Sequence, residues 1–288
     1  MASILITGAT GKTGGAAAFP LLDQGHHVRA LVHHTDERAD RLATAGAEIV
    51  LGDLHDLDVL SRATKGVDAL YYVHPIAPGL LDSTATLLQA AEENQVGAIV
   101  NMSQISARRE AVSNAARQHW LAERLLDHFS GGVTHLRPTF FAEWLISFWD
   151  ADTGELRLPF AQAHHAPITA EDQGRVIAAI LADPQPHAGR TYPLYGPVEL
   201  DHHQIADVMT RALGRKITYV PVEIDQFRAE LEARGFSAHL VQHLTNVAID
   251  YRNGIFSGTN DAVRAITGVE PLTVEAFVER NRTSWPNR

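Results

Sequence analysis

The sequence contains no cysteine, and this absence excludes several kinds of chemistry at once. Disulfide scaffolds, thiolate metal sites and thiol nucleophiles all require cysteine, so none of them is expected. The chain also lacks any apolar run near the roughly 18 residues that cross a bilayer. It starts with a short apolar strand, Ile4, Leu5 and Ile6, and not with a signal peptide. We therefore expect a soluble, cytoplasmic protein that does not contact a membrane.

Positive charge is also scarce. The 24 Lys and Arg residues are outnumbered by 34 Asp and Glu residues, which gives a formal net charge of −10. Such a balance disfavours binding to nucleic acid or to an anionic surface. Sixteen histidines include several adjacent pairs, but adjacent histidines rarely share one metal ion, so no metal site is expected. The expected partner is a small molecule, and the sequence leaves the oligomeric state open.

Short apolar runs alternate with amphipathic stretches through the first half of the chain. Strands are expected near residues 2–7, 27–32, 47–51, 69–73, 98–102 and 133–136. Helices are expected between them, near residues 12–24, 36–45, 80–94 and 114–129. Because no tight hairpins separate the strands, the pattern predicts an α/β fold with a doubly wound, parallel sheet of the Rossmann type.

The pattern changes after Arg137 and Pro138. An aromatic segment and a loop are followed by a strand near 191–194 and by helices near 170–182, 202–213, 223–233 and 237–250. We expect a dinucleotide-binding domain over residues 1–138 and a smaller, mostly helical, substrate-binding lobe over residues 139–288. Parts of the second half, such as residues 166–195, are expected to return to the first domain.

A glycine-rich turn joins the first predicted strand to the first predicted helix. Its glycines have the spacing of a dinucleotide fingerprint, which needs a tight turn, close approach to pyrophosphate and close helix–strand packing. The helix N-terminus adds free amides and a positive dipole end. A P-loop is excluded because its first glycine would fall on Ile6, within the strand. The turn therefore predicts a bound nicotinamide dinucleotide, held by Gly8, Thr10, Gly11, Lys12, Thr13 and Gly14.

The choice between NAD and NADP is normally made at the end of the second strand. An acidic residue there binds the ribose hydroxyls of NAD, whereas a basic residue accommodates the 2′-phosphate of NADP. This strand runs into His33 and His34, and Asp36 is the expected cap of the next helix. Imidazoles can donate hydrogen bonds to a phosphate. The sequence therefore favours NADP(H) over NAD(H), with Lys12, His33 and His34 on the phosphate side.

These motifs resemble the NmrA-like branch of the atypical short-chain dehydrogenases/reductases over essentially the whole chain. The resemblance implies that Asp53 and Leu54 flank the adenine, and that His74 and Pro75 border the middle of the cofactor. The likeness is carried by the segments Ile6-Thr7-Gly8-Ala9-Thr10-Gly11, Val28-Arg29-Ala30-Leu31-Val32, Gly52-Asp53-Leu54, Val73-His74-Pro75, Leu136-Arg137-Pro138 and Gly268-Val269-Glu270-Pro271.

The resemblance spans two classes of function. Similar members reduce quinones, dyes and other conjugated acceptors, whereas others are redox-sensing regulators that bind the cofactor without turnover. The usual Tyr-x-x-x-Lys pair of the superfamily would fall on Ala115 and His119, so the tyrosine acid is missing. Protonating the alkoxide of an ordinary ketone needs such an acid, whereas a quinone gives a stabilised phenolate. We therefore expect an NAD(P)H-dependent reductase of a quinone-like acceptor, with a redox sensor or a carbonyl or imine reductase as alternatives.

Two residues are the candidates for contact with the reacting groups. Ser103 follows the fifth strand, where it can bind a substrate carbonyl or simply cap a loop. His119 can orient the nicotinamide or donate a proton, or it can be a polar residue on a helix face. The quinone-reductase members carry a similar His-x-x-x-Glu arrangement, which His119 and Glu123 match. Glu123 itself is expected to be structural and to pair within its helix or with Arg137.

Aromatic residues follow the last strand of the predicted dinucleotide domain. Phe140, Phe141 and Trp144 are either core residues or the wall against which a flat acceptor stacks. Their position at the carboxyl end of the sheet, where such folds bind ligands, favours the second role. Further on, His164 and His165 are expected in a solvated loop.

Overall fold

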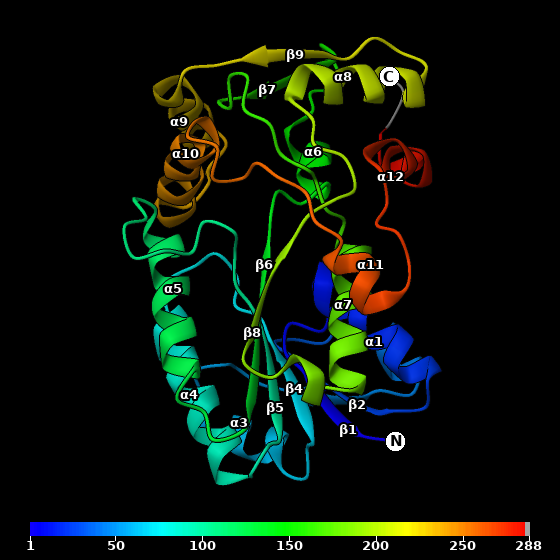
Figure 1. Cartoon of the computed structure of the whole chain (residues 1–288), viewed down its shortest axis with the longest axis vertical. Helices are drawn as coiled ribbons and strands as arrows, with labels where there is room; N and C mark the ends of the chain where they lie inside the picture. The colour runs from blue at the N-terminus through cyan, green and yellow to red at the C-terminus, as the bar shows by residue number, and fades with distance from the viewer. Residues whose placement is uncertain (286–288) are drawn as a thin grey trace.

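Strands and helices alternate through the first half of the chain, in a computed structural model that describes residues 1–285 (Figure 1). The strands are β1 Ser3–Ile6, β2 His27–Val32, β3 Glu48–Leu51, β4 Ala69–Tyr72, β5 Ala98–Met102 and β6 Gly132–Pro138. The helices are α1 Lys12–Asp23, α2 Glu37–Thr44, α3 Leu57–Thr64, α4 Leu80–Glu93 and α5 Asn114–Leu126. The predicted elements are thus present, and α3 is an additional helix that the apolar pattern did not indicate.

The main sheet has seven strands in the order β3-β2-β1-β4-β5-β6-β8, and every pairing in it is parallel. Strand β8, Arg190–Leu194, belongs to the second half of the chain but pairs with β6. The order of the strands reverses beside β1, because β2 lies on one side of it and β4 on the other. The predicted Rossmann-type fold is confirmed, and its ligand crevice lies at the carboxyl ends of β1 and β4.

Helices cover both faces of the sheet (Figure 1). On one face, α4 packs between α3 and α5. On the other face, α1 packs against α7, Ala170–Ala182, which in turn contacts α11, Ala262–Thr267. The approach of α7 to α1 requires a glycine, because a Cβ at Gly174 would lie 2.5 Å from the backbone carbonyl carbon of Ala16.

Side chains cap the N-termini of most of these helices. Asp36 accepts hydrogen bonds from the amides of Arg38 and Ala39, which confirms it as the cap of α2. Asp56 caps α3 in the same way, and Ser113 caps α5 by accepting from the amide of Ala116. The cap at Asp56 is the local signal that identifies α3 as a helix.

A second lobe lies above the carboxyl edge of the sheet (Figure 1). Its core is continuous from the aromatic segment to the last helix. The lobe also contains a two-stranded parallel sheet, β7 paired with β9. The prediction of a mostly helical lobe did not include this sheet. No helix within residues 1–285 has the length and apolarity that a bilayer span needs. The elements of the lobe are α6 Glu143–Phe148, β7 Glu155–Leu158, α8 His202–Leu213, β9 Thr218–Pro221, α9 Ile224–Ala233, α10 Ala238–Arg252 and α12 Val274–Arg280.

The loop that carries His164 and His165 is only half solvated. His164 is exposed, but the expectation of solvent is wrong for His165, which is 0% exposed. Two backbone hydrogen bonds, one in each direction between His165 and Leu200, hold this part of the loop against the segment before α8. The ring of His165 lies 5.0 Å from that of Phe140 and 4.8 Å from that of His202, which is also fully buried.

These buried imidazoles predict a loss of stability in mild acid. Burial lowers the pKa of His165 to about 3 from its ordinary 6.5, and it also lowers the pKa of His202 well below that ordinary value. Above pH 6.5 the rings are neutral whether the chain is folded or unfolded, so they do not favour either state. Below that value only the unfolded chain takes up the protons. The free energy of unfolding should then fall by about 1.4 kcal/mol per pH unit for each such histidine.

Urea unfolding across the range from neutral pH to about pH 5 measures this slope. His165→Phe, which keeps a ring of similar size against Phe140, should give a shallower slope than the wild type. His128→Asn, at an exposed histidine, serves as the matched control and should leave the slope unchanged. Identical slopes for His165→Phe and the wild type would contradict the assignment.

Candidate active site

A cleft of about 500 Å³ lies at the carboxyl edge of the sheet, over the ends of β1, β2, β3 and β4. It extends from the glycine turn to the loop after β4, along the crevice where the strand order reverses. Most of the residues expected to bind the cofactor line it. They are Gly8, Thr10, Gly11, Lys12, Thr13, His33, Asp53, Leu54, His74 and Pro75.

The glycine turn has the geometry that a pyrophosphate site needs. Gly8 has a φ of +57°, and a Cβ there would lie 2.7 Å from Cγ1 of Val73. Gly14 does not line the cleft, but any Cβ on it would collide with the carbonyl oxygen of Gly8, so it sets how closely α1 packs. Gly11 starts α1 without a side-chain cap or an acidic residue in the first turn. The free amides at the start of α1 could therefore hold an anionic group such as a pyrophosphate.

The far end of the cleft is polar. The carboxylate of Asp53 accepts hydrogen bonds of 2.8 Å from the backbone amide and from the ring of His55. These bonds, with a further contact to Nε2 of His33 at 3.2 Å, lower the pKa of Asp53. His34 is not among the residues that line the cleft, and its Nε2 lies 4.0 Å from Asp36.

His74 lies at the boundary between this cleft and a second cavity. Its Nδ1 is 2.7 Å from the carbonyl oxygen of Pro75, which can only accept, so Nδ1 carries the proton and Nε2 is an acceptor. Burial lowers the pKa of His74, so its neutral form is favoured.

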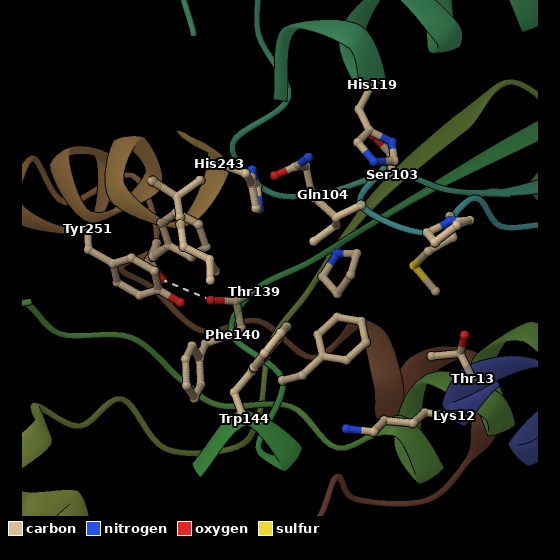
Figure 2. A pocket seen from close by; sticks show the side chains of 18 of the residues that line it. Lys12, Thr13, Ser103, Gln104, His119, Thr139, Phe140, Trp144, His243 and Tyr251 are labelled. Atoms are coloured by element: carbon tan, nitrogen blue, oxygen red, sulfur yellow. Dashed lines mark hydrogen bonds between the residues drawn. The ribbon is translucent and has the colours of Figure 1, made fainter. Parts of the chain in front are cut away.

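The second cavity, of about 490 Å³, lies between the sheet and the lobe. One side is aromatic and is lined by Phe140, Phe141 and Trp144, as expected for an acceptor site (Figure 2). Trp144 stacks on Phe148, with ring centroids 5.4 Å apart and an interplanar angle of 23°. None of the described residues that line the cavity is acidic. It adjoins the cofactor cleft through the shared residues Lys12, Thr13, Val73, His74, Pro75 and Phe141.

The opposite side of the cavity is polar. Figure 2 shows His119, Ser103, Gln104 and His243 in a row across from Trp144. Oγ of Ser103, Nε2 of Gln104 and Nδ1 of His119 are buried there without a hydrogen-bond partner. Leaving a buried polar atom unpaired costs roughly 1–3 kcal/mol. A concentration of such atoms on a single cavity wall indicates a site that is completed by a ligand.

His119 is buried on α5 and faces this cavity. Burial, with a contribution from His243, lowers the pKa of His119 to about 3. Its imidazolium form is therefore not populated near neutral pH, so the expected proton-donor role is disfavoured. A neutral hydrogen-bonding role remains open to it.

Glu123 lies one turn after His119 and holds α5 against β6. The guanidinium of Arg137 donates to both of its carboxylate oxygens, with a distance of 2.8 Å from Nε to Oε1. Glu123 is fully buried, whereas Arg137 is partly exposed. The expected structural pairing of Glu123 with Arg137 is confirmed.

Removing the charge of Glu123 should destabilise the protein. Glu123→Gln leaves Arg137 without its counter-ion, and we expect the free energy of unfolding to fall by about 3 kcal/mol. Arg124→Gln is the control, because Arg124 is an exposed partner of the same carboxylate and should cost less than about 1 kcal/mol. Denaturant unfolding measures both values, and equal losses in the two variants would rule out the buried pair as a main anchor of α5.

Three residues that the structure places at these two cavities or beside the glycine turn were not singled out by the sequence patterns. Gln104 directly follows Ser103 and could have been found from that position. His243 comes from α10, and no motif near it links it to the sheet. Arg38 lies on α2, where Nη1 donates to the carbonyl oxygen of Thr10 in the glycine turn at 3.1 Å. Only the folded chain reveals the last two positions.

The chain is similar to known proteins over almost its full length. It is 26% identical to the NAD(P)H azoreductase of Xenophilus azovorans over 286 residues, which cover 98% of this chain and 99% of the relative. Among solved structures, an NADPH-dependent quinone oxidoreductase from Escherichia coli, complexed with NADPH, has a TM-score of 0.86 and 22% identity, covering 97% and 99% of the two chains.

NmrA, a negative transcriptional regulator solved in complex with NADP, has a TM-score of 0.80 and 17% identity, covering 96% and 94% of the two chains. At these identities the solved structures support the fold alone. The model of the NmrA-like family matches residues 1–271, and the chain therefore belongs to the NmrA-like family.

Proposed function

We propose that this protein is an NAD(P)H-dependent oxidoreductase that transfers hydride to a quinone-like or other conjugated, electron-poor acceptor. The main support is the junction of the two cavities. A cleft that fits a dinucleotide opens into an aromatic cavity, whose opposite wall carries unpartnered polar atoms. Flat, conjugated molecules suit such a cavity because they stack on aromatic rings. The similarity to an azoreductase over almost the full length supports the same reaction class.

The bound dinucleotide would supply the hydride, and the chain's own residues would bind and orient both partners. The amides of α1 would hold the pyrophosphate, and His74 and Pro75, which line the cleft, would border the middle of the cofactor. Trp144 and Phe140 hold the flat face of the acceptor and exclude water from it. Ser103 and His119 provide polar contacts near the reacting groups.

We further propose that NADP(H) is preferred over NAD(H). Two imidazoles, His33 and His34, directly follow β2, where the 2′-phosphate would lie, and Lys12 lines the same cleft from α1. Arg38 joins them, because its guanidinium lies against the glycine turn and is held there by Asp36 at 2.6 Å. No acidic residue directly follows β2 in the sequence. The nearby carboxylate of Asp36 is already engaged by Arg38, and that of Asp53 by His33 and His55.

The role of Arg38 can be tested by measuring the affinity of the protein for NADPH and for NADH. Arg38→Ala should raise the Kd of NADPH by about fivefold, because one exposed charge-assisted contact contributes about 1 kcal/mol. The Kd of NADH should change by less than about twofold. Isothermal titration calorimetry measures both constants, and Arg41→Ala, on the same helix, is the control. Equal weakening of the two cofactors would argue against a 2′-phosphate contact.

The reductase proposal itself is tested by oxidation of NADPH, and separately of NADH, with a panel of quinones, azo dyes and ketones. We expect turnover with the conjugated acceptors and little or none with simple ketones. His119→Ala should lower turnover while leaving cofactor binding intact. Unchanged turnover in that variant would remove His119 from the reaction.

A second function remains a candidate because a regulator bound to NADP shares this fold. A redox sensor would bind the dinucleotide tightly, discriminate its oxidised from its reduced form, and turn over none of the acceptors. That combination of results in the same assays would replace the reductase with the sensor.

A further inference from the structure

One polar group of the acceptor cavity comes from the lobe and not from the sheet. His243 lies on α10 and lines the cavity, and it does not line the cofactor cleft. Its neighbour Gln242 anchors α10 to the start of α5, because its amide accepts from the backbone of Asn114 at 3.0 Å and donates to Val112 at 3.2 Å. The position of His243 is therefore fixed relative to the start of α5.

The hydrogen bonds of Ser113 determine where the ring of His243 carries its proton. Oγ of Ser113 accepts from the amide of Ala116 and lies 2.8 Å from Nδ1 of His243. If Nδ1 were the donor, the hydroxyl proton of the fully buried Ser113 would lack an acceptor among the described residues. The satisfied arrangement has Ser113 donating to Nδ1. The proton of the neutral ring is then on Nε2, on the side of the ring away from Ser113.

We propose that His243 is a neutral hydrogen-bond donor for the acceptor, and that its Nε2–H binds the oxygen on which negative charge develops during hydride transfer. This assignment rests on the proposed reductase function. It adds His243 to the residues that contact the acceptor, and it requires the His243 ring to be neutral. Gln104 lies beside His243 on the same wall, and its unpartnered Nε2 is a second donor for the same oxygen (Figure 2).

The chemistry needs no proton from His243. A quinone that accepts a hydride gains two electrons and one hydrogen and becomes a hydroquinone monoanion, while the nicotinamide is oxidised. Solvent supplies the second proton and completes the hydroquinone. The task left to the chain is to stabilise the anion in a cavity with an aromatic wall, and a fixed N–H donor does this at little reorganisation cost.

Burial suits His243 to this role. It lowers the pKa of His243 to about 4, with a smaller contribution from His239. The ring therefore stays neutral near physiological pH, keeps the tautomer that Ser113 selects, and polarises an oxygen without an ionisation step. A neutral imidazole whose pKa is depressed by its surroundings acts as the electrophile in this way in other enzymes.

The test compares two acceptors whose reduction changes charge in opposite directions. Hydride transfer to a quinone such as menadione creates an anion, whereas transfer to a cationic triphenylmethane dye such as malachite green neutralises a cation. His243→Phe, which keeps a ring but has no N–H, should lower kcat/KM for menadione by about 10- to 100-fold, as loss of one oxyanion donor does. Turnover of the dye should change by less than about threefold. His243→Gln, which retains an N–H donor, should recover part of the menadione activity.

Dye turnover by His243→Phe also shows that the variant is folded and binds cofactor. Equal losses with both acceptors would mean that His243 only shapes the cavity, and that result overturns the proposal. Unchanged menadione turnover overturns it as well.

A binding measurement separates this proposal from the proposed function. With 4-nitrophenol as the probe, the phenolate band should appear at lower pH when the probe is bound to the wild type than when it is bound to His243→Phe. The reason is that the donor favours the bound anion. If the wild type reduces neither acceptor, the reductase proposal fails, and this titration still decides whether His243 is an anion-stabilising donor. The same bound pKa in both proteins rejects the donor assignment.

Discussion

Parallel pairing along the seven-stranded sheet brings the carboxyl ends of its strands to one edge, and all the functional groups described here depend on that arrangement. Strands β1 to β6 each contribute their last residues or the loop that follows. The glycine turn follows β1, His33 follows β2, Asp53 follows β3, His74 follows β4 and Ser103 follows β5. A single antiparallel strand in the middle of the sheet would send its loop to the opposite edge and interrupt the cleft.

The lobe completes what the sheet cannot provide. A Rossmann-type sheet offers backbone amides and short polar side chains at its edge, which suit phosphate and ribose. It does not offer a large apolar surface there. The second half of the chain supplies that surface with Phe140, Trp144 and the aromatic residues behind them, while His243 reaches across from α10. Under the proposed function, cofactor binding and acceptor selection would fall largely to different halves of the chain.

The sequence was most informative where function depends on local geometry. The turn is largely local, because Cβ atoms at Gly11 and Gly14 would meet the carbonyl oxygen of Gly8, although a Cβ at Gly8 itself would meet the distant Val73. The partner of the buried Glu123 was also within reach, because Arg137 lies next to the end of the predicted strand. The tautomer of His243 depends on Ser113, which lies 130 residues away in the chain. No periodicity carries such information, and the same holds for the burial of His165 and for the pairing of β7 with β9.

The wall shared by the two cavities makes each ligand a part of the other's binding site. Lys12, His74 and Phe141 line both spaces, so a dinucleotide in the cleft would close one side of the space that receives the acceptor. If the reduced cofactor raises the affinity of the protein for the acceptor, then the bound acceptor must raise the affinity for the reduced cofactor by the same factor. The junction is therefore a point of thermodynamic coupling, where the redox state of one molecule sets the affinity for another.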